Sequence, residues 1–355
     1  MYSLIMAGGI GKRFWPRSRR SKPKQLLDIV SSASMLRLTY DRLKNISEEK
    51  KIYAVANPGL KDSILGELQE MPPSNYITEP CGKNTAPCIG LSAAIIAERD
   101  PDAVIGVFPA DHLIRDTASF RRAVQTGYQV ARDHDALVTF GIRPTRPATG
   151  YGYIQLNKKK PILDDTAFKV KTFAEKPNLE TAKRFLESGE FLWNSGMFIW
   201  RAQAILNALR MFLPELHSSL QNITRAISKP GFETVLKKEW AAISSDSIDY
   251  GVMEKAKNVY VVRGNFDWSD VGSWDSVYEM QEKDKEGNLL FGENLVLSSE
   301  GNYIYSEKGI VATVGVKDLI IIQTKDALLI VNRHDSERVK EVVDYLEREK
   351  RQEYL

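Results

Sequence analysis

Short apolar runs alternate with helical segments through the first half of this 355-residue chain, and this alternation is the strongest restriction on its fold. The runs have the length of β-strands, and most are bounded by Gly, Pro, Asn or Asp; they lie at residues 3–7, 51–56, 103–108 and 136–140. Segments between them, such as 35–43 and 89–96, repeat apolar residues along one helical face. The pattern predicts an α/β fold in which a mostly parallel sheet is flanked by crossover helices.

The sequence pattern changes after about residue 287, where short runs typical of β-strands are separated by turns. They predict a small β module, which is followed by a helix with one apolar stripe: Val339, Val342, Val343 and Leu346. The stripe packs on its own domain or forms a homodimer contact. No linker rich in Gly, Ser or Pro interrupts the earlier part. We therefore expect two domains, a larger one at 1–285 and a C-terminal one at 286–355.

Composition excludes several classes of protein. The chain is 43% hydrophobic and 27% charged, which is ordinary for a globular protein. Its two cysteines, Cys81 and Cys88, cannot build a disulfide framework, and their spacing does not match zinc sites. No apolar run approaches the roughly 20 residues of a membrane span, and residues 4–7 are too short for a signal peptide. We expect no membrane partner and a cytoplasmic location.

Positive charge is concentrated near the N-terminus, although the net charge is only +3. Seven cations and no acid occur between residues 12 and 24: Lys12, Arg13, Arg17, Arg19, Arg20, Lys22 and Lys24. This run indicates an anionic partner, with a solvated loop as the alternative. Only Phe14 and Trp15 interleave with the charges, which disfavours a nucleic-acid partner.

Three glycines follow the first predicted strand, at Gly8, Gly9 and Gly11. Glycines in this position let the backbone turn sharply and bring its N–H groups close to a phosphate. Two well-known nucleotide motifs do not fit, because Phe14 stands where the dinucleotide fingerprint needs a small residue, and the P-loop would need a glycine at Met6. The segment is a phosphate loop of another kind.

The glycine loop and the Pro23-Lys24 that follows it resemble the signature of the sugar-nucleotide pyrophosphorylases. Six further motifs occur in the matching order: Glu79-Pro80-Cys81-Gly82-Lys83-Asn84-Thr85-Ala86-Pro87, Phe108-Pro109-Ala110-Asp111-His112, Thr149-Gly150-Tyr151-Gly152-Tyr153-Ile154, Phe173-Ala174-Glu175-Lys176-Pro177, Trp193-Asn194-Ser195-Gly196-Met197-Phe198 and Trp268-Ser269-Asp270-Val271-Gly272-Ser273-Trp274. Together they resemble the mannose-1-phosphate guanylyltransferases. The resemblance implies the Rossmann-like nucleotidyltransferase fold, and the C-terminal module resembles the partial left-handed β-helix of that family.

The chemistry brings several phosphate charges together, so the site must supply cations. Arg13 and Lys24 are the candidates for holding the leaving diphosphate. By resemblance, Asp111 pairs with Asp270 to hold Mg²⁺, an ion that prefers carboxylate and phosphate oxygens. A strand-end aspartate that only caps a turn is the alternative for Asp111. These four residues are the expected catalytic group.

The remaining site residues also come from the resemblance. The expected nucleotide-binding residues are Gly8, Gly9, Gly11, Arg13, Gly82, Asn84, Thr85 and Asp111, with base choice assigned to the segment from Gly82 to Thr85. The expected sugar-phosphate-binding residues are Gly150, Glu175, Lys176 and Asn194. A surface ion pair is the alternative for Glu175 and Lys176, and a turn-stabilising role is the alternative for Asn194. His112 is expected to be structural.

The implied reaction is in-line attack of mannose 1-phosphate on the α-phosphorus of GTP, giving GDP-mannose and diphosphate without a covalent enzyme intermediate. Two alternatives stay open: a pyrophosphorylase for another hexose 1-phosphate or base, and a sugar-nucleotide-binding subunit without turnover. The second should lack one of the four catalytic candidates, and this chain keeps all of them. The chain ends at Leu355, so we expect no isomerase domain and a single activity.

Overall fold

The computed structural model describes residues 1–163 and 166–355 and separates into two units, neither of which is continuous in sequence. Unit 1 consists of Met1–Gly8, Tyr40–Ala110 and Ile114–Trp268. Unit 2 consists of Gly9–Thr39, Asp111–Leu113 and Ser269–Leu355. The chain first crosses between the units after Gly8 and within α1 (Met35–Lys44). It crosses again between β4 (Val104–Pro109) and β5 (Leu113–Ile114), within β5, and within β11 (Trp268–Ser269). The domain boundary expected at residue 285 stays a prediction.

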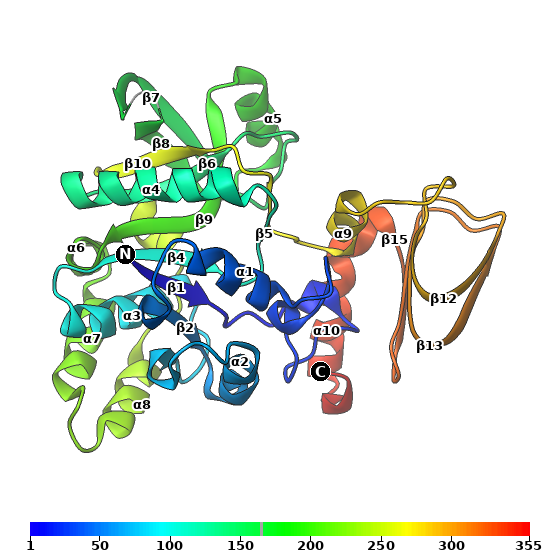
Figure 1. The fold of residues 1–355 in the computed structure, drawn as a ribbon, viewed down its shortest axis with the longest axis horizontal. Helices are drawn as coiled ribbons and strands as arrows, with labels where there is room; N and C mark the ends of the chain where they lie inside the picture. The colour runs from blue at the N-terminus through cyan, green and yellow to red at the C-terminus, as the bar shows by residue number, and fades with distance from the viewer. Residues whose placement is uncertain (164–165) are drawn as a thin grey trace. The chain divides into compact units, whose positions relative to one another are not determined.

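Unit 1 is built on a nine-stranded sheet, counted over the described residues, with the order β3-β2-β1-β4-β9-β6-β10-β8-β7 (Figure 1). Besides β4, its strands are β1 (Tyr2–Met6), β2 (Ile52–Ala56), β3 (Tyr76–Thr78), β6 (Leu137–Ile142), β7 (Tyr153–Ile162), β8 (Ala167–Ala174), β9 (Phe191–Arg201) and β10 (Val259–Gly264). Strands β9 and β8 run antiparallel to their neighbours, and the pairs β1–β2, β1–β4, β2–β3 and β6–β10 are parallel. The expected α/β class is confirmed, and the sheet is mixed.

Helices cover the sheet because each presents one apolar face to it. Helix α4 (Thr117–His134) lies along β9, β10 and β6 (Figure 1). It begins at Asp116, whose side chain accepts from the N–H of Ser119 at 2.9 Å, and it buries Phe120 and Val124. The other elements of unit 1 are α2 (Lys61–Glu67), α3 (Thr85–Arg99), α5 (Leu179–Ser188), α6 (Ala202–Phe212), α7 (Pro214–Ala226), α8 (Phe232–Ala242) and the π-helical turn η6 (Asp249–Met253).

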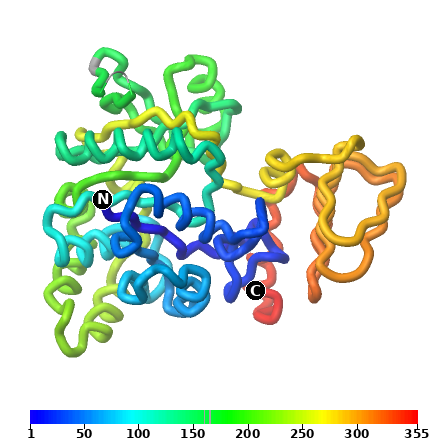
Figure 2. The backbone as a smooth tube through the Cα atoms, viewed as in Figure 1, coloured from blue at the N-terminus to red at the C-terminus, as the bar shows by residue number. Residues whose placement is uncertain are grey.

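Unit 2 contains the predicted C-terminal β module and the terminal helix. Its elements are the short helices η1 (Lys12–Phe14), η2 (Lys24–Leu26) and η7 (Arg333–Arg338), the strands β12 (Leu289–Leu297), β13 (Tyr303–Val314), β14 (Leu319–Gln323) and β15 (Leu328–Asn332), and the helices α9 (Trp274–Met280) and α10 (Val339–Arg348). Strands β12, β13 and β14 pair in parallel, and β15 is antiparallel to β14. The backbone winds in successive coils through these strands (Figure 2), which confirms the β-helix-like module.

Buried asparagines hold successive coils of this module in register. The side chain of Asn302 donates to Asn288 Oδ1 at 3.0 Å and accepts from the N–H of Leu319 at 2.9 Å. Asn288 in turn donates to the carbonyl of Ser299 at 3.1 Å. Because an unpaired polar group inside the module would cost free energy, these bonds fix how the coils stack.

One apolar core joins the N-terminal segment of unit 2 to its C-terminal elements. Phe14, Trp15 and Met35 are buried in the same cluster as Trp274, Tyr303, Ile320, Val339 and Val343. The Phe14 and Trp274 rings meet edge to face at 4.9 Å, and the indole of Trp274 donates to the carbonyl of Trp15 at 3.1 Å. The stripe of the terminal helix therefore packs on its own unit through Val339 and Val343. Among the described residues, no helix combines the length and the apolar character that crossing a membrane requires.

Candidate active site

The glycine loop begins just after β1, and Gly11 has a structural reason to be glycine. Its φ is +74°, in the left-handed region, and a Cβ atom there would lie 2.4 Å from Cβ of Lys24. The carbonyl of Gly11 accepts from the N–H of Phe14 at 2.9 Å and from the hydroxyl of Ser18 at 2.8 Å. The absent side chain thus lets Lys24 pass directly beneath the loop.

Lys24 is the central contact of the predicted catalytic group. Its side chain is only 5% exposed, and its ammonium donates to Asp111 Oδ2 and to the backbone carbonyl of Asp270, each at 2.8 Å. Arg13, Lys24, Asp111 and Asp270 all line one cavity of about 330 Å³ within unit 2. The structure therefore brings the four residues together, and their roles stay predictions.

The charge on Asp111 is set by two opposing effects. Burial raises the pKa of its carboxyl. The positive charges of Lys24 and His112 and the hydrogen bond from Lys24 lower the pKa, and together they outweigh burial, so the pKa lies below its usual value. The side chain keeps 37% of its surface exposed. Asp111 is thus an accessible carboxylate on the wall of the cavity, and His112, 8% exposed, lines the same wall.

Most of the cationic run is neutralised inside unit 2. Lys12 pairs with Asp344 and Glu347, at 2.8 and 2.7 Å, and the remaining pairs are Arg17–Asp28, Arg19–Asp326 and Arg20–Glu347. In the described parts of the chain, Arg13 and Lys22 form no ion pair, and Nε of Arg13 is buried without a hydrogen-bond partner. Arg13, which lines the cavity, can therefore bind an anion without first breaking an ion pair.

Gly8 belongs to unit 1 and packs against a buried carboxyl group. A Cβ atom on Gly8 would lie 2.5 Å from Oε1 of Glu79, which directly follows β3. Glu79 is 3% exposed, and this burial raises the pKa of its carboxyl to about 7. Gly9 differs, because a Cβ atom there would meet nothing within 4 Å. The fold therefore explains Gly8 and leaves Gly9 without a packing reason.

The segment expected to read the base has structural tasks of its own. Asn84, with a φ of 70°, caps α3 through its side-chain oxygen, which accepts from the N–H of Thr85 at 2.9 Å. The hydroxyl of Thr85 accepts from the N–H of Ile248 at 2.8 Å. Gly82 is exposed and has open space where its Cβ would lie. These contacts leave Gly82 as the unengaged part of the segment.

The predicted sugar residues gather in unit 1 around Glu175. Its side chain is 7% exposed, and one carboxylate oxygen lies 3.1 Å from the ammonium of Lys176. The other oxygen, Oε2, is buried and has no hydrogen-bond partner among the described residues. A Cβ atom on Gly152 would lie 2.4 Å from this oxygen. Burial raises the pKa of Glu175, and Lys176 opposes that shift. Gly150 lies two residues before Gly152 and has open space at its Cβ position.

Asn194 connects this group to a second buried carboxyl, Asp249. Its amide nitrogen donates to Asp249 Oδ1 at 2.8 Å, and its amide oxygen accepts from the hydroxyl of Thr139 at 2.7 Å. Burial raises the pKa of Asp249 to about 7, and the charge of Glu175 adds to the shift. The backbone N–H of Asn194 also donates to the carbonyl of Gly152 at 2.8 Å. Hydrogen bonds thus hold Asn194 to Gly152, Thr139 and Asp249, and Glu175 packs against Gly152.

Three residues of these groups were not assigned roles from the sequence. Glu79 begins the Glu79–Pro87 motif, and its position after a buried strand was a signal that could have identified it as a candidate site residue. Asp249 interrupts the otherwise uncharged stretch 247–253, which was a weaker signal. Lys340 lines the cavity of Arg13 and Lys24 from a helix more than 300 residues away, and no pattern in the sequence indicates that approach.

Comparison with known proteins gives the class of enzyme. A family model described as "Nucleotidyl transferase" matches residues 2–287, and one described as "MannoseP isomerase/GMP-like beta-helix domain" matches residues 292–346. The chain belongs to the nucleotidyl transferase family. Enzymes of this kind act on a nucleoside triphosphate and a sugar phosphate and generally use a divalent metal ion.

Several relatives carry a more particular name. The chain is 40% identical to the mannose-1-phosphate guanylyltransferase RfbM of Salmonella typhimurium, over 99% of this chain and 73% of that protein. It is 39% identical to a mannose-1-phosphate guanylyltransferase of Escherichia coli K12, over 100% of this chain and 75% of that protein. A crystal structure from Thermus thermophilus, described as a mannose-1-phosphate geranyltransferase, is 32% identical with a TM-score of 0.87 and covers 98% of this chain and 99% of its own.

Proposed function

We propose that this protein is a mannose-1-phosphate guanylyltransferase, which converts GTP and mannose 1-phosphate to GDP-mannose and diphosphate. The observation that carries the proposal is the cavity in which Arg13, Lys24, Asp111 and Asp270 come together. The identity to relatives of that name over nearly the whole chain supports the choice of substrates.

In the proposed reaction a phosphate oxygen of mannose 1-phosphate bonds to the α-phosphorus of GTP. The bond from that phosphorus to the oxygen bridging to the β-phosphate breaks, and diphosphate leaves with the electron pair. Arg13 and Lys24 bind the phosphate oxygens and offset the charge that develops on the leaving group. The attacking oxygen is already ionised, so the chain needs no general base. Gly9, which no packing contact requires to be glycine, leaves room for the triphosphate.

We further propose that the metal is Mg²⁺ and that Asp111 and Asp270 hold it. In the part of the chain that the structure describes, no three His, Cys, Asp or Glu side chains are grouped to bind a metal. A pair of hard carboxylates suits an ion that takes its other ligands from water and substrate phosphates, as Mg²⁺ does. When bound, such an ion neutralises phosphate charge and strengthens the electrophilic character of the phosphorus.

Recognition of guanine is assigned to Glu79 rather than to Asn84. The edge of guanine presents N–H donors, and a buried carboxylate is an acceptor that pairs with such donors. Asn84 and Thr85 are occupied in capping α3 and in holding Ile248. Glu79 is buried directly against Gly8, at the start of the glycine loop. A base that lacks the matching donors would leave this carboxylate unpaired, which is a strong basis for discrimination.

Recognition of the hexose is assigned to Glu175, with Lys176 on the sugar phosphate. Oε2 of Glu175 is a buried acceptor to which no described residue donates a hydrogen bond, and a sugar hydroxyl would satisfy it. Asn194 serves mainly to position this group, because its amide oxygen and one N–H are already bonded to Thr139 and Asp249. Gly150 is kept as a backbone contact to the sugar.

Release of diphosphate from pairs of substrates tests the proposal. GTP, ATP, UTP and dTTP are each supplied with mannose 1-phosphate and with glucose 1-phosphate, in the presence of Mg²⁺. We expect the highest kcat/KM with GTP and mannose 1-phosphate, and Asp270→Asn serves as the inactive control. Comparable rates with glucose 1-phosphate would contradict the sugar assignment. Absence of release from every pair would contradict catalysis and favour a binding subunit.

Two further expectations stay proposals. A homodimer is supported by the large apolar side chains that β12–β15 leave exposed, including Leu295, Ile310 and Ile330, and sedimentation of the full chain tests it. The cytoplasmic location is supported by the nature of the proposed substrates, and fractionation of cells tests it.

A further inference from the structure

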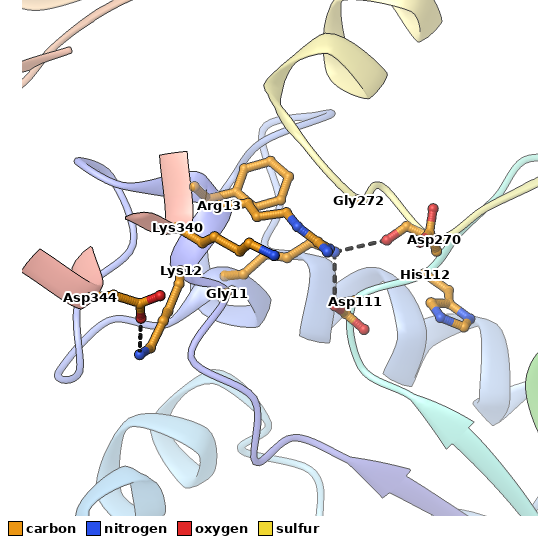
Figure 3. A pocket seen from close by; sticks show the side chains of 11 residues that line it. Gly11, Lys12, Arg13, Asp111, His112, Asp270, Gly272, Lys340 and Asp344 are labelled. Atoms are coloured by element: carbon orange, nitrogen blue, oxygen red, sulfur yellow. Dashed lines mark hydrogen bonds and ion pairs between the residues drawn. The ribbon is translucent and has the colours of Figure 1, made fainter. Parts of the chain in front are cut away.

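The C-terminal helix α10 contributes two side chains, Lys340 and Asp344, to the lining of the cavity that contains Arg13 and Lys24. They are four residues apart, so they lie on the same side of the helix. Figure 3 shows Lys340 extending from α10 toward Gly11 and Arg13, whereas Asp344 points toward Lys12. All of these residues belong to unit 2. The cavity is therefore lined from both ends of the sequence.

Asp344 is the nearest acid on the same helix face, but it is already paired. The ammonium of Lys12 donates to Asp344 Oδ1 at 2.8 Å and to Glu347 Oε2 at 2.7 Å. Arg20 also contacts Glu347, at 3.1 Å. Lys12 and Arg20 thus neutralise Asp344 and Glu347, and the third acid of α10, Glu341, pairs with Arg338. Lys340 itself has no ion pair or hydrogen bond in the described parts of the chain, and it is exposed.

A cation in this position has a clear electrostatic effect. Four cations line one cavity: Lys12 is paired there with Asp344 and Lys24 with Asp111, whereas in the described parts of the chain Arg13 and Lys340 have no acid partner. An unpaired ammonium on a cavity wall lowers the free energy of a multiply charged anion inside it, and a phosphate chain can contact several such groups at once. A solvated surface lysine would instead be indifferent to what the cavity holds.

We propose that Lys340 binds the diphosphate portion of the nucleoside triphosphate, so that α10 supplies a second cation without an acid partner, beside Arg13, to the phosphate site. The naming of the triphosphate rests on the proposed function. The pairing of Lys12 with Asp344 and Glu347 has a related consequence, because it holds α10 against the glycine loop and keeps the negative charge of Asp344 off the anion. The C-terminal module is then part of the substrate site.

Titration calorimetry with inorganic diphosphate as the probe tests the proposal on the full chain. Lys340→Gln should weaken diphosphate binding about five- to tenfold, the size expected for one charge-assisted contact at a partly exposed site. Lys340→Arg should keep most of the affinity. The matched control is Lys308→Gln, which removes an exposed, unpaired lysine in the same unit outside the cavity lining. All three variants should unfold at the wild-type temperature.

The same loss should appear in the KM for GTP and not in the KM for mannose 1-phosphate. Equal diphosphate affinity for Lys340→Gln and the wild-type chain would overturn the proposal, as would an equal loss in Lys308→Gln or no measurable diphosphate binding by the wild-type chain. If the chain fails to make GDP-mannose but Lys340→Gln still weakens diphosphate binding selectively, the proposed function fails and the role of Lys340 stands. The two ideas can therefore fail separately.

Discussion

Replacing Gly11 by alanine should destabilise the fold by an amount that follows from two features of the structure. Alanine at a φ of +74° adopts a left-handed conformation, which costs about 1–2 kcal/mol. Its Cβ would also lie 2.4 Å from Cβ of Lys24, so the loop or the lysine must shift, at a further cost of about 1–3 kcal/mol. The expected loss of about 2–5 kcal/mol is large beside the roughly 5–15 kcal/mol that stabilise a typical domain.

Urea unfolding followed by tryptophan fluorescence measures this loss, because Trp15 and Trp274 lie in the core that the loop joins. The matched control is Gly9→Ala, two residues earlier, where a Cβ atom meets nothing within 4 Å and φ is not positive. Gly9→Ala should leave the free energy of unfolding within about 1 kcal/mol of the wild-type value but raise the KM for GTP. An unchanged midpoint for Gly11→Ala would refute the packing argument, and an unchanged KM for Gly9→Ala would refute the phosphate cradle.

Three further predictions concern single carboxyl groups. Asp111→Asn should lower the rate of diphosphate release by orders of magnitude and, by removing the partner of buried Lys24, cost about 1–3 kcal/mol in urea unfolding; a wild-type rate in excess Mg²⁺ would contradict the metal assignment. Because burial raises the pKa of Asp249 to about 7, the folded chain keeps a proton that the unfolded chain loses near pH 4, so stability should fall as the pH rises from 4 to 7. Asp249→Asn should flatten the dependence of the melting temperature on pH, and an unaltered dependence would contradict the raised pKa of Asp249. Glu79→Gln should reduce the ratio of kcat/KM for GTP over ATP, whereas an unchanged ratio would return base recognition to the segment from Gly82 to Thr85.

Local patterns predicted many of the secondary-structure elements well, because the relevant signals are short. The apolar runs at 3–7, 51–56 and 103–108 correspond closely to β1, β2 and β4, since a buried strand needs little more than a run of apolar residues between turns. Asp111 follows such a run directly, whereas Lys24 was singled out by the Pro23-Lys24 motif, and the two side chains meet at 2.8 Å. The antiparallel course of β9 was not predictable, because its direction depends on pairing with β4 and β6 rather than on its own sequence.

Charge was harder to interpret than hydrophobicity. The cations between residues 12 and 24 were expected to attract an external anion, but Lys12, Arg19 and Arg20 are paired with acids more than 300 residues later. A single sequence does not reveal such partners, because opposite charges attract across any separation in the chain. The role of Lys340 was missed for the same reason, because it lies more than 300 residues after the segment that it approaches. Asn84 and Thr85 were chosen for their chemistry, and their contacts with α3 and Ile248 appear only in the folded backbone.

The shared core of unit 2 also determines when the phosphate loop can form during synthesis. Residues 9–39 leave the ribosome early, yet Phe14 and Trp15 pack on Tyr303, Val339 and Val343, and the indole of Trp15 donates to the carbonyl of Tyr354 at 3.0 Å. A nascent chain that has not yet reached these residues leaves Phe14 and Trp15 without their apolar partners. The segment 9–39 can therefore complete its packing only after the C-terminal elements of unit 2 have been synthesised.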